Sequence, residues 1–169
     1  MAIGAVSITG MARDCVNILG IETSCDETAA AVVANGRVVK SSVVASQTEL
    51  HEKYGGVVPE IASRAHIEQI YPVIAEAIER AGIGKDEIDA VAAANQPGLT
   101  IALVVGVTAA KTLSFALERP LIAINHLHAH LQSAMLAEDE LELPAVALIV
   151  SGGHTCLYDC ESPLELKLL

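Results

Sequence analysis

The chain has 169 residues, of which 52% are hydrophobic but only 2% aromatic, and a formal net charge of −11. This length suffices for one domain with a substantial core, or for one domain and part of another. So negative a chain has no broad cationic surface, which excludes a protein that binds nucleic acid strongly by itself. A mean hydropathy of +0.47 with so few aromatic residues implies an aliphatic core, and that favours an α/β fold with buried parallel strands.

The first residues and the apolar segments do not indicate secretion or a membrane span. Residues 1–16 lack a basic start and a cleavage site, so we interpret them as a disordered leader or an over-extended start. Lys111 interrupts the apolar segment 103–110 before it reaches spanning length, so we expect no membrane contact and a cytoplasmic location. The spacing of the cysteines makes no disulfide framework, which fits a reducing compartment: Cys15, Cys25, Cys156 and Cys160. The stretch "CLYDC" could suggest a metal site, but we expect Cys156 and Cys160 to be buried or half-buried free thiols on one face of a strand.

Three antiparallel strands are expected first. Residues 17–24 are an aliphatic run that ends in polar residues, and residues 28–46 contain two strands around Asn35 and Gly36. Because both of these residues tolerate positive φ, they are a strong signal of a hairpin turn.

A long helix should follow the three strands. Pro59 suits its first turn and Gly82 its end, while Pro72 should kink it. Residues with helical spacing predict one apolar stripe along it: Ile67, Ile70, Ile74, Ile78 and Ala81.

The next elements complete one unit. Residues 88–95 predict a strand, residues 101–119 an apolar helix and residues 120–124 another strand. Small residues on that helix should let a second helix approach closely: Ala102, Gly106, Ala109 and Ala110. After one further helix a strand, a glycine turn and a strand begin again. We therefore expect a first domain at 17–143 and the first hairpin of a truncated second domain at 144–169.

The stretch "HLHAHL" at 126–131 has two possible structures. On a strand, His126, His128 and His130 would point the same way. On a helix only His126 and His130 would share a face. Asn125 suits a helix N-cap, and apolar residues repeat with helical spacing: Leu127, Leu131, Ala134 and Met135. We therefore expect a helix, with His128 exposed and turned away from the other two; two histidines alone are an incomplete metal site, and ordinary surface histidines are the alternative.

Two loops between strands suit an anion, "ETSCDET" at 22–28 and "SGGHT" at 151–155. Glycines let the backbone approach an anion, and successive amides can point at it, although a plain hairpin turn has the same residues. The order β-β-β-α-β-α-β-α resembles that of the actin-like ATPase superfamily, a ribonuclease-H-like fold. Proteins of that superfamily hold nucleotide between two such domains, so the resemblance implies an actin-like domain with the start of a truncated second copy.

Five segments together resemble one family more specifically. They are "GIETSCDETAAAVV", "YGGVVPEIASRAH", "QPGL", "NHLHAHL" and "LIVSGGHT". Their order and spacing resemble the amino-terminal half of the tRNA N6-adenosine threonylcarbamoyltransferase family, over residues 17–169. Asn95 and Gln96 depart from the family pattern before "PGL". The resemblance implies transfer of the threonylcarbamoyl group from threonylcarbamoyl-adenylate to N6 of adenosine-37, in tRNAs that read codons starting with A.

The resemblance also implies roles for residues of this chain. His126 and His130 would bind one divalent metal, iron in bacterial members, together with an aspartate that this chain lacks. Asp26, Glu27 and His154 would be catalytic, with plain turn residues as the alternative. His66 we interpret as a satisfied polar residue of the long helix. The family's substrate-binding segment falls on five consecutive residues: Ile149, Val150, Ser151, Gly152 and Gly153.

Partners and rival functions follow from the same resemblance. It implies tRNA bound through a multi-protein complex, and a related actin-like partner protein docked on helices 57–82 and 99–118. A non-catalytic partner module of the same complex is the main alternative, against which the histidine pair argues. A metalloprotease is a remote one, because the chain has no H-E-x-x-H. We expect the 169-residue chain alone to be inactive.

Overall fold

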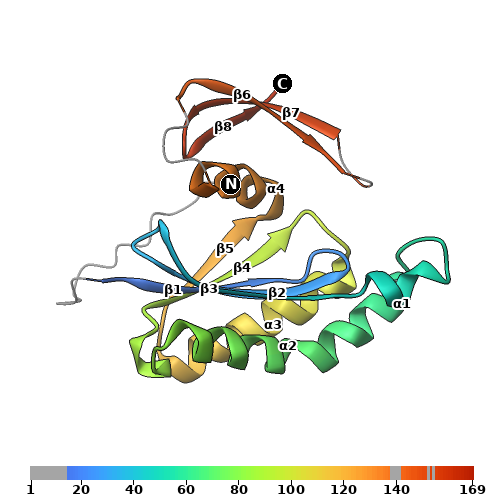
Figure 1. Cartoon of the computed structure of the whole chain (residues 1–169), viewed down its shortest axis with the longest axis vertical. Coiled ribbons are helices and arrows are strands. Elements are labelled where there is room, and N and C mark those ends of the chain that lie inside the picture. Colours follow the sequence, from blue (N-terminus) through green and yellow to red (C-terminus); the bar gives the residue numbers. More distant parts are fainter. Residues whose placement is uncertain (1–14, 138–141, 152, 154) are drawn as a thin grey trace. The chain divides into compact units, whose positions relative to one another are not determined.

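The computed structural model describes residues 15–137, 142–151, 153 and 155–169 (Figure 1). Most of the expected leader, together with Gly152 and His154, lies outside the described residues. The chain divides into two compact units at Ile124 and Asn125. The helix with the histidines therefore belongs to the second unit, so the division does not coincide with the expected boundary after residue 143.

A five-stranded sheet forms the centre of the first unit, in the order β3-β2-β1-β4-β5. β1, β2 and β3 are antiparallel neighbours, whereas β4 runs parallel to β1. Asn35 and Gly36 have φ of 51° and 71°, which confirms the predicted hairpin turn. The strands are β1 (Asn17–Glu22), β2 (Glu27–Ala34), β3 (Val38–Ser46), β4 (Ala90–Gln96) and β5 (Leu121–Asn125).

Two long helices, α2 (Pro59–Ala81) and α3 (Thr100–Leu117), cover the same face of this sheet (Figure 1). α2 begins with Pro59 in its first turn and ends at Gly82, whose φ of 66° is left-handed. Both ends were predicted, and the helix is continuous through Pro72. A short helix, α1 (Thr48–Glu52), and a 3-10 turn, η1 (Lys85–Glu87), were not predicted.

The predicted apolar stripe of α2 is wrong in part. The face that packs on the sheet includes Ala62, His66 and Ala77, whereas Ile67 is 62% exposed. Ile74 and Ile78 are each 7% exposed and belong to the core with residues of the sheet, and Ile70 and Ala81 pack against that core. Helical periodicity therefore predicted most of the buried face correctly and was wrong for Ile67.

The apolar helix α3 also differs from its prediction. By length and composition it is long enough and apolar enough to cross a membrane. The expectation that Lys111 rules out a segment of spanning length is therefore wrong. In this fold Ala102, Gly106 and Ala110 are buried against the rest of the unit. Gly106 faces the side chain of Thr23 after β1, and not a second helix as predicted. Gly106 therefore admits a loop, whereas Ala109 and Ala110 pack in the core to which α2 also contributes.

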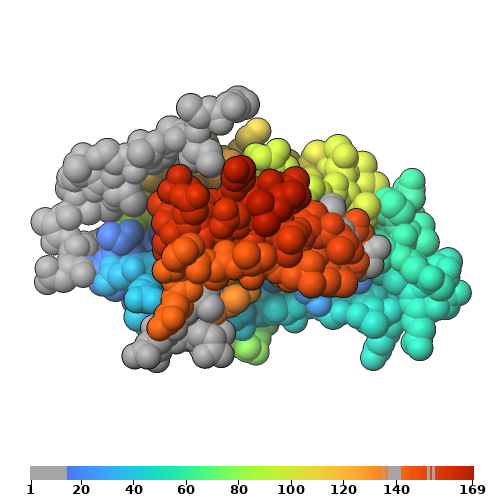
Figure 2. Space-filling view, turned by 90° about the horizontal axis from the view of Figure 1, so that it is seen from above, coloured from blue at the N-terminus to red at the C-terminus, as the bar shows by residue number. Residues whose placement is uncertain are grey.

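The second unit consists of α4 (His126–Ala137) and an antiparallel sheet in the order β6-β7-β8. Its small core contains Leu131, Tyr158 and Cys160, with Cys156 beside them. The other face of β6 exposes Val146, Leu148 and Val150; Figure 2 shows this outer side of the unit, in orange to red. The strands are β6 (Ala145–Val150), β7 (Thr155–Ser162) and β8 (Glu165–Leu168).

All four cysteines are free thiols, as predicted. Cys156 and Cys160 lie on the same side of β7, which strand alternation requires. Cys156 is half-buried and Cys160 is buried, as predicted, whereas Cys25 is exposed. Cys25 lies in the loop after β1, between the buried side chains of Ser24 and Thr28.

Candidate functional site

The loop 22–28 between β1 and β2 is anchored by small polar side chains. Thr23, Ser24 and Thr28 are buried, whereas Cys25 and Glu27 are exposed and Asp26 is half-buried. The backbone of Glu22 and Glu27 belongs to the two strands. The loop is therefore held at both ends and presents two carboxylates and a thiol between its anchors.

One anchor joins the loop to α3. The Thr23 hydroxyl donates to the carbonyl of Ala102 at 2.9 Å and accepts from the N–H of Gly106 at 3.2 Å. An α-helix pairs that carbonyl with that N–H, so the Thr23 hydroxyl bonds to both groups of one helical pair. A Cβ on Gly106 would lie 2.4 Å from the Thr23 Oγ1, so only glycine fits here.

A second anchor joins the loop to the turn before α3. The N–H of Leu99 donates to the carbonyl of Ser24 at 2.8 Å. A Cβ on Gly98 would meet that same carbonyl oxygen at 2.6 Å. Glycine therefore permits the two backbones to approach to hydrogen-bonding distance.

A third anchor comes from α2. His66 is fully buried, its Nδ1 lies 2.8 Å from the Thr28 Oγ1, and its Nε2 lies 3.1 Å from the carbonyl of Cys25. This confirms that His66 is a satisfied polar residue. Sequence reasoning did not predict that its partners belong to the loop.

The Cys25 thiol is held in its neutral form. Although the side chain as a whole is exposed, partial desolvation of the thiol raises its pKa from 9.0 to about 11. A hydrogen bond with Asp26 and the negative charges of Asp26, Glu27 and Glu22 add to this shift of the pKa. Since the thiolate is the nucleophile, Cys25 is a poor candidate for covalent catalysis at neutral pH.

The histidine pair occupies the first turn of α4, so the predicted helix is confirmed. The Asn125 side chain caps it, accepting from the N–H of Leu127 at 2.9 Å and of His128 at 3.2 Å. The Nε2 atoms of His126 and His130 lie 3.1 Å apart, with ring centroids at 4.5 Å. The two imidazoles therefore converge on one face, as predicted.

His128 is turned away from this pair, but it is not exposed as expected. Its ring is half-buried and meets the Tyr158 ring edge-on, with centroids 5.9 Å apart. Desolvation of the Tyr158 hydroxyl raises its pKa, and the Cys156 thiol adds to that shift. His128 thus belongs to the small core of the second unit.

The distance between the two imidazoles fits a shared metal ion. Two nitrogens that each lie about 2.1 Å from one metal are about 3.0–3.4 Å apart for angles near 90–110°. The observed 3.1 Å lies in this range, although an N–H···N hydrogen bond between two neutral rings has a similar length. Across the described residues, no group of three or more His, Cys, Asp or Glu could hold a metal. The pair fits as two ligands of a larger set.

The turn after β6 is described only in part. Ile149 is half-buried beside the small core of the second unit, whereas Val150 and Ser151 are exposed. Strand alternation turns Ile149 and Val150 to opposite faces, so their side chains cannot line one site together. The N–H of Gly153 lies 3.3 Å from the Ser151 Oγ.

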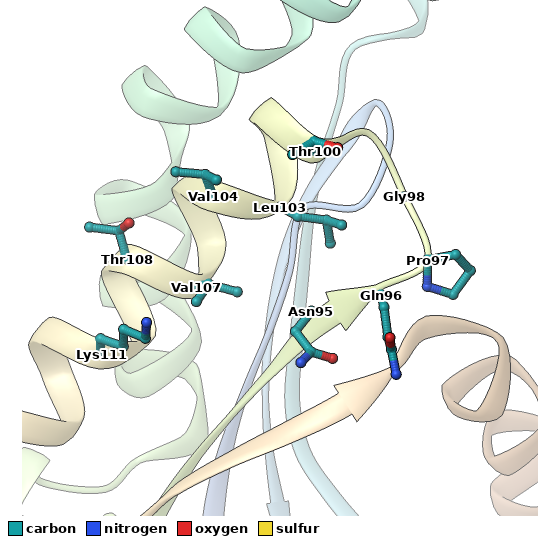
Figure 3. Close-up of a pocket in the computed structure, with 10 residues that line it drawn as sticks. All are labelled: Asn95, Gln96, Pro97, Gly98, Thr100, Leu103, Val104, Val107, Thr108 and Lys111. Carbon is teal, nitrogen blue, oxygen red and sulfur yellow. The ribbon is translucent and has the colours of Figure 1, made fainter. Parts of the chain in front are cut away.

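A hollow of about 550 Å³ lies where β4 leads into α3 (Figure 3). Asn95 and Gln96 lie at the end of β4, and Lys111 lies two to three turns along the helix. Leu103 and Val107 line the side between them. Asn95 and Gln96 are the residues that depart from the expected family pattern, and this hollow was not predicted.

Comparison with solved structures agrees with this architecture. YeaZ from Pseudomonas aeruginosa superposes with a TM-score of 0.61 at 22% identity, over 91% of this chain and 64% of YeaZ. A PPX-GPPA enzyme from Aquifex aeolicus superposes with a TM-score of 0.50 at 11% identity, over 92% of this chain and 52% of the enzyme. At such identities the likeness concerns the fold alone, and the chain is a mixed α/β protein of this architecture.

Sequence comparison is more specific. The family model for tRNA N6-adenosine threonylcarbamoyltransferase (TsaD) matches residues 38–169. The protein of that name from Symbiobacterium thermophilum is 60% identical over 152 residues, which are 90% of this chain and 45% of the relative. Its counterpart from Syntrophobacter fumaroxidans is 58% identical over 141 residues, which are 83% of this chain and 42% of that relative. The chain belongs to the tRNA N6-adenosine threonylcarbamoyltransferase family, and it spans less than half the length of these relatives.

Proposed function

We propose that this chain is the amino-terminal portion of an enzyme that transfers a threonylcarbamoyl group to tRNA. The donor would be threonylcarbamoyl-adenylate and the acceptor N6 of adenosine-37, in tRNAs that read codons starting with A. The family match over residues 38–169 carries this proposal, and the convergent histidine pair supports it. On this proposal the fold is an actin-like, ribonuclease-H-like domain followed by the start of a second one.

Each described segment has a role in this proposal. His126 and His130 would hold a divalent metal, iron by family resemblance, with further ligands from elsewhere in the assembled enzyme. When bound, such a metal acts as a Lewis acid toward the oxygens of the donor. The turn that contains Ser151 and Gly153 would face the donor, since backbone amides in a turn attract an anion.

The carboxylates of the loop 22–28 suit proton transfer. The attacking exocyclic amine must lose a proton as its nitrogen bonds to the carbamoyl carbon and the adenylate leaves. Asp26 and Glu27 lie between the anchors of the loop, and a positioned carboxylate can accept that proton. We assign this role to one of the two, and His154 remains a further candidate.

The partner surface would be the groove between α2 and α3. This groove encloses about 520 Å³, and exposed apolar side chains line it, among them Ile67, Tyr71 and Val104. Apolar patches of this kind on a soluble chain mark protein–protein contacts. A related actin-like protein would dock here, and tRNA would be bound by the resulting complex in the cytoplasm.

The test joins this chain to the carboxy-terminal portion of the Symbiobacterium thermophilum relative. Single-turnover transfer of labelled threonine to unmodified tRNA is measured with the donor-making enzyme and partner proteins supplied. We expect transfer by the joined protein, none by the 169-residue chain, and loss of transfer in His126→Ala and His130→Ala. His128→Ala is the matched control and should keep most activity; transfer that survives loss of either paired histidine would contradict the proposal.

A second candidate is a non-catalytic docking role for the 169-residue chain by itself. The exposed groove between α2 and α3 favours it, because docking there needs neither the metal nor the donor. Co-purification with an actin-like partner, without bound metal and without transfer, would support this role. Substitution of Tyr71, 74% exposed in the groove, by Asp should abolish the co-purification.

A further inference from the structure

A chain of buried hydrogen bonds leads from α1 to the loop 22–28. The N–H of Val58, which precedes α2, lies 3.3 Å from the Nδ1 of His51. The Nε2 of His51 lies 3.1 Å from the Oε1 of Gln47, and the Nε2 of Gln47 lies 3.3 Å from the Nδ1 of His66. His51, Gln47 and His66 are at most 5% exposed, so water does not compete for these bonds.

The hydrogen-bond partners in this series fix the tautomer of each histidine ring. A carbonyl only accepts, so the Nε2 of His66 must carry the hydrogen that it donates to Cys25. The amide nitrogen of Gln47 only donates, so the Nδ1 of His66 must accept, and the Thr28 hydroxyl can donate to the same atom. Both requirements define one neutral tautomer of His66, with hydrogen on Nε2.

The same logic holds at the other end. The N–H of Val58 only donates, so the His51 Nδ1 accepts, and its Nε2–H donates to the Gln47 oxygen. The Gln47 amide nitrogen also lies 3.4 Å from the carbonyl of Ala62, which excludes the flipped amide. Within this series of hydrogen bonds, only one combination of tautomers and amide orientation lets every donor face an acceptor.

We propose that His66 is the positioning residue of the loop 22–28: its Nε2–H holds the Cys25 carbonyl, while Gln47 and Thr28 fix its ring from the Nδ1 side. The carbonyl of Cys25 immediately precedes Asp26, so this bond sets the backbone from which the two carboxylates project. That these carboxylates serve catalysis rests on the proposed function. The positioning itself does not depend on it.

Protonation would disturb the Nδ1 side of this arrangement. A second hydrogen on the His66 Nδ1 would face the Gln47 amide nitrogen, which cannot accept it, and would require the Thr28 hydroxyl to turn from donor to acceptor. Burial lowers the pKa of His66 below 6.5, and the nearby His51 lowers it too, whereas the Cys25 carbonyl, Asp26 and Glu22 raise it. The net lowering keeps the ring neutral, and the loop held, at neutral pH.

Two substitutions of His66 test separately the contacts made by its Nε2 and its Nδ1. His66→Gln places an amide near the position of Nε2 and keeps a donor for Cys25, whereas His66→Asn reaches only the Nδ1 position and loses that donor. Gln69→Asn, at an exposed residue of α2, is the control for a change on the same helix. All three are made in the 169-residue chain, with circular dichroism to check that each variant folds.

Amide hydrogen exchange of residues 22–28 is the first measurement. We expect exchange about tenfold faster in His66→Asn, the scale of one lost hydrogen bond, and little change in His66→Gln or in the control. Titration of the Cys25 thiol is the second, because its raised pKa of about 11 depends on the ordered loop. This pKa should fall toward 9.0 in His66→Asn only.

A pH series separates positioning from a merely structural role. In the wild-type chain, exchange of the loop should rise on acidification with the midpoint of the His66 ring titration, and His66→Gln should lack that step. Nitrogen NMR of the wild-type ring should show hydrogen on Nε2 and none on Nδ1 at neutral pH. Equal effects of Asn and Gln, or hydrogen on Nδ1, would overturn the inference. None of these measurements uses transfer activity, so failure of the proposed function would leave them unchanged.

Discussion

The two loops expected to contact the donor are held in different ways. Loop 22–28 has three buried polar anchors, which bond to α2, to α3 and to the turn before α3. The turn after β6 sits on an antiparallel hairpin, and among its described residues the N–H of Gly153 bonds internally to the Ser151 hydroxyl. In the histidine pair, His126 is half-buried and His130 is exposed.

This difference separates stability from ligand binding. A group fixed by buried partners cannot be changed without a cost to folding, because each lost partner leaves an unsatisfied polar atom. A group on an exposed face can be changed with little effect on the fold. Substitutions around loop 22–28 should therefore act first on stability, and those at the histidine pair first on ligand binding.

The largest effect expected concerns the histidine pair. His126→Ala or His130→Ala should weaken binding of a divalent metal to the chain by about a hundredfold or abolish it, because one imidazole remains. The free energy of unfolding should change by no more than about 0.5 kcal/mol. Titration with Co²⁺, followed by absorbance, measures the first quantity and urea denaturation the second. His128→Ala should keep metal binding but lower the free energy of unfolding. Equal metal binding by all three variants would show that the histidine pair does not bind the metal.

A pair of glycine substitutions compares the two loops directly. Gly106→Ala should destabilise the fold by about 1–3 kcal/mol, because the new Cβ would overlap the Thr23 hydroxyl. Gly153→Ala should cost no more than about 0.5 kcal/mol, since nothing lies within 4 Å of its Cβ position. Urea denaturation of both variants checks this, and a larger loss for Gly153→Ala would contradict the contrast.

A smaller effect is expected from Thr23→Val. Valine has nearly the shape of threonine but leaves the N–H of Gly106 and the carbonyl of Ala102 without the hydroxyl that bonds to both. We expect a loss of about 1 kcal/mol, because those two groups can still pair within the helix. In a double-mutant cycle, Thr23→Ala should recover some of the cost of Gly106→Ala. Additive losses would show that the two residues do not interact.

The smallest effect expected is a pH dependence of stability. The pKa of His66 is lowered in the fold, so the unfolded chain binds more protons between that lowered pKa and 6.5. Stability from this residue is therefore complete above pH 6.5 and is lost as the pH falls through the folded pKa. Urea denaturation across this window should show a flatter profile for His66→Gln than for the wild type. Identical profiles would show that groups other than His66 cause the loss of stability in acid.

Local signals in the sequence predicted local structure well. Asn35 and Gly36 predicted the hairpin turn, Pro59 and Gly82 the ends of α2, and Asn125 the cap of α4. In each case the physical cause lies within a few residues of the signal. For the same reason the convergence of His126 and His130 could be predicted, since it needs only one helical turn.

Contacts between distant residues were not predictable in this way. His66 and Cys25 are 41 positions apart, and Thr23 and Gly106 are 83 apart. A fully buried histidine on an amphipathic helix has no local signature that distinguishes it from an exposed one. The exposure of Ile67 was missed for a related reason: it continues the helical spacing of the isoleucines, but which of them are buried depends on the sheet and on α3.

The contact between Thr23 and Gly106 has a consequence for how this family varies in sequence. The hydroxyl and the missing Cβ occupy one small volume, so neither position can change freely while the other stays the same. A lineage that gains a larger residue at 106 must first, or at once, acquire a smaller one at 23. Among many homologous sequences the two positions should therefore be linked as a substitution pair, despite the 83 residues between them.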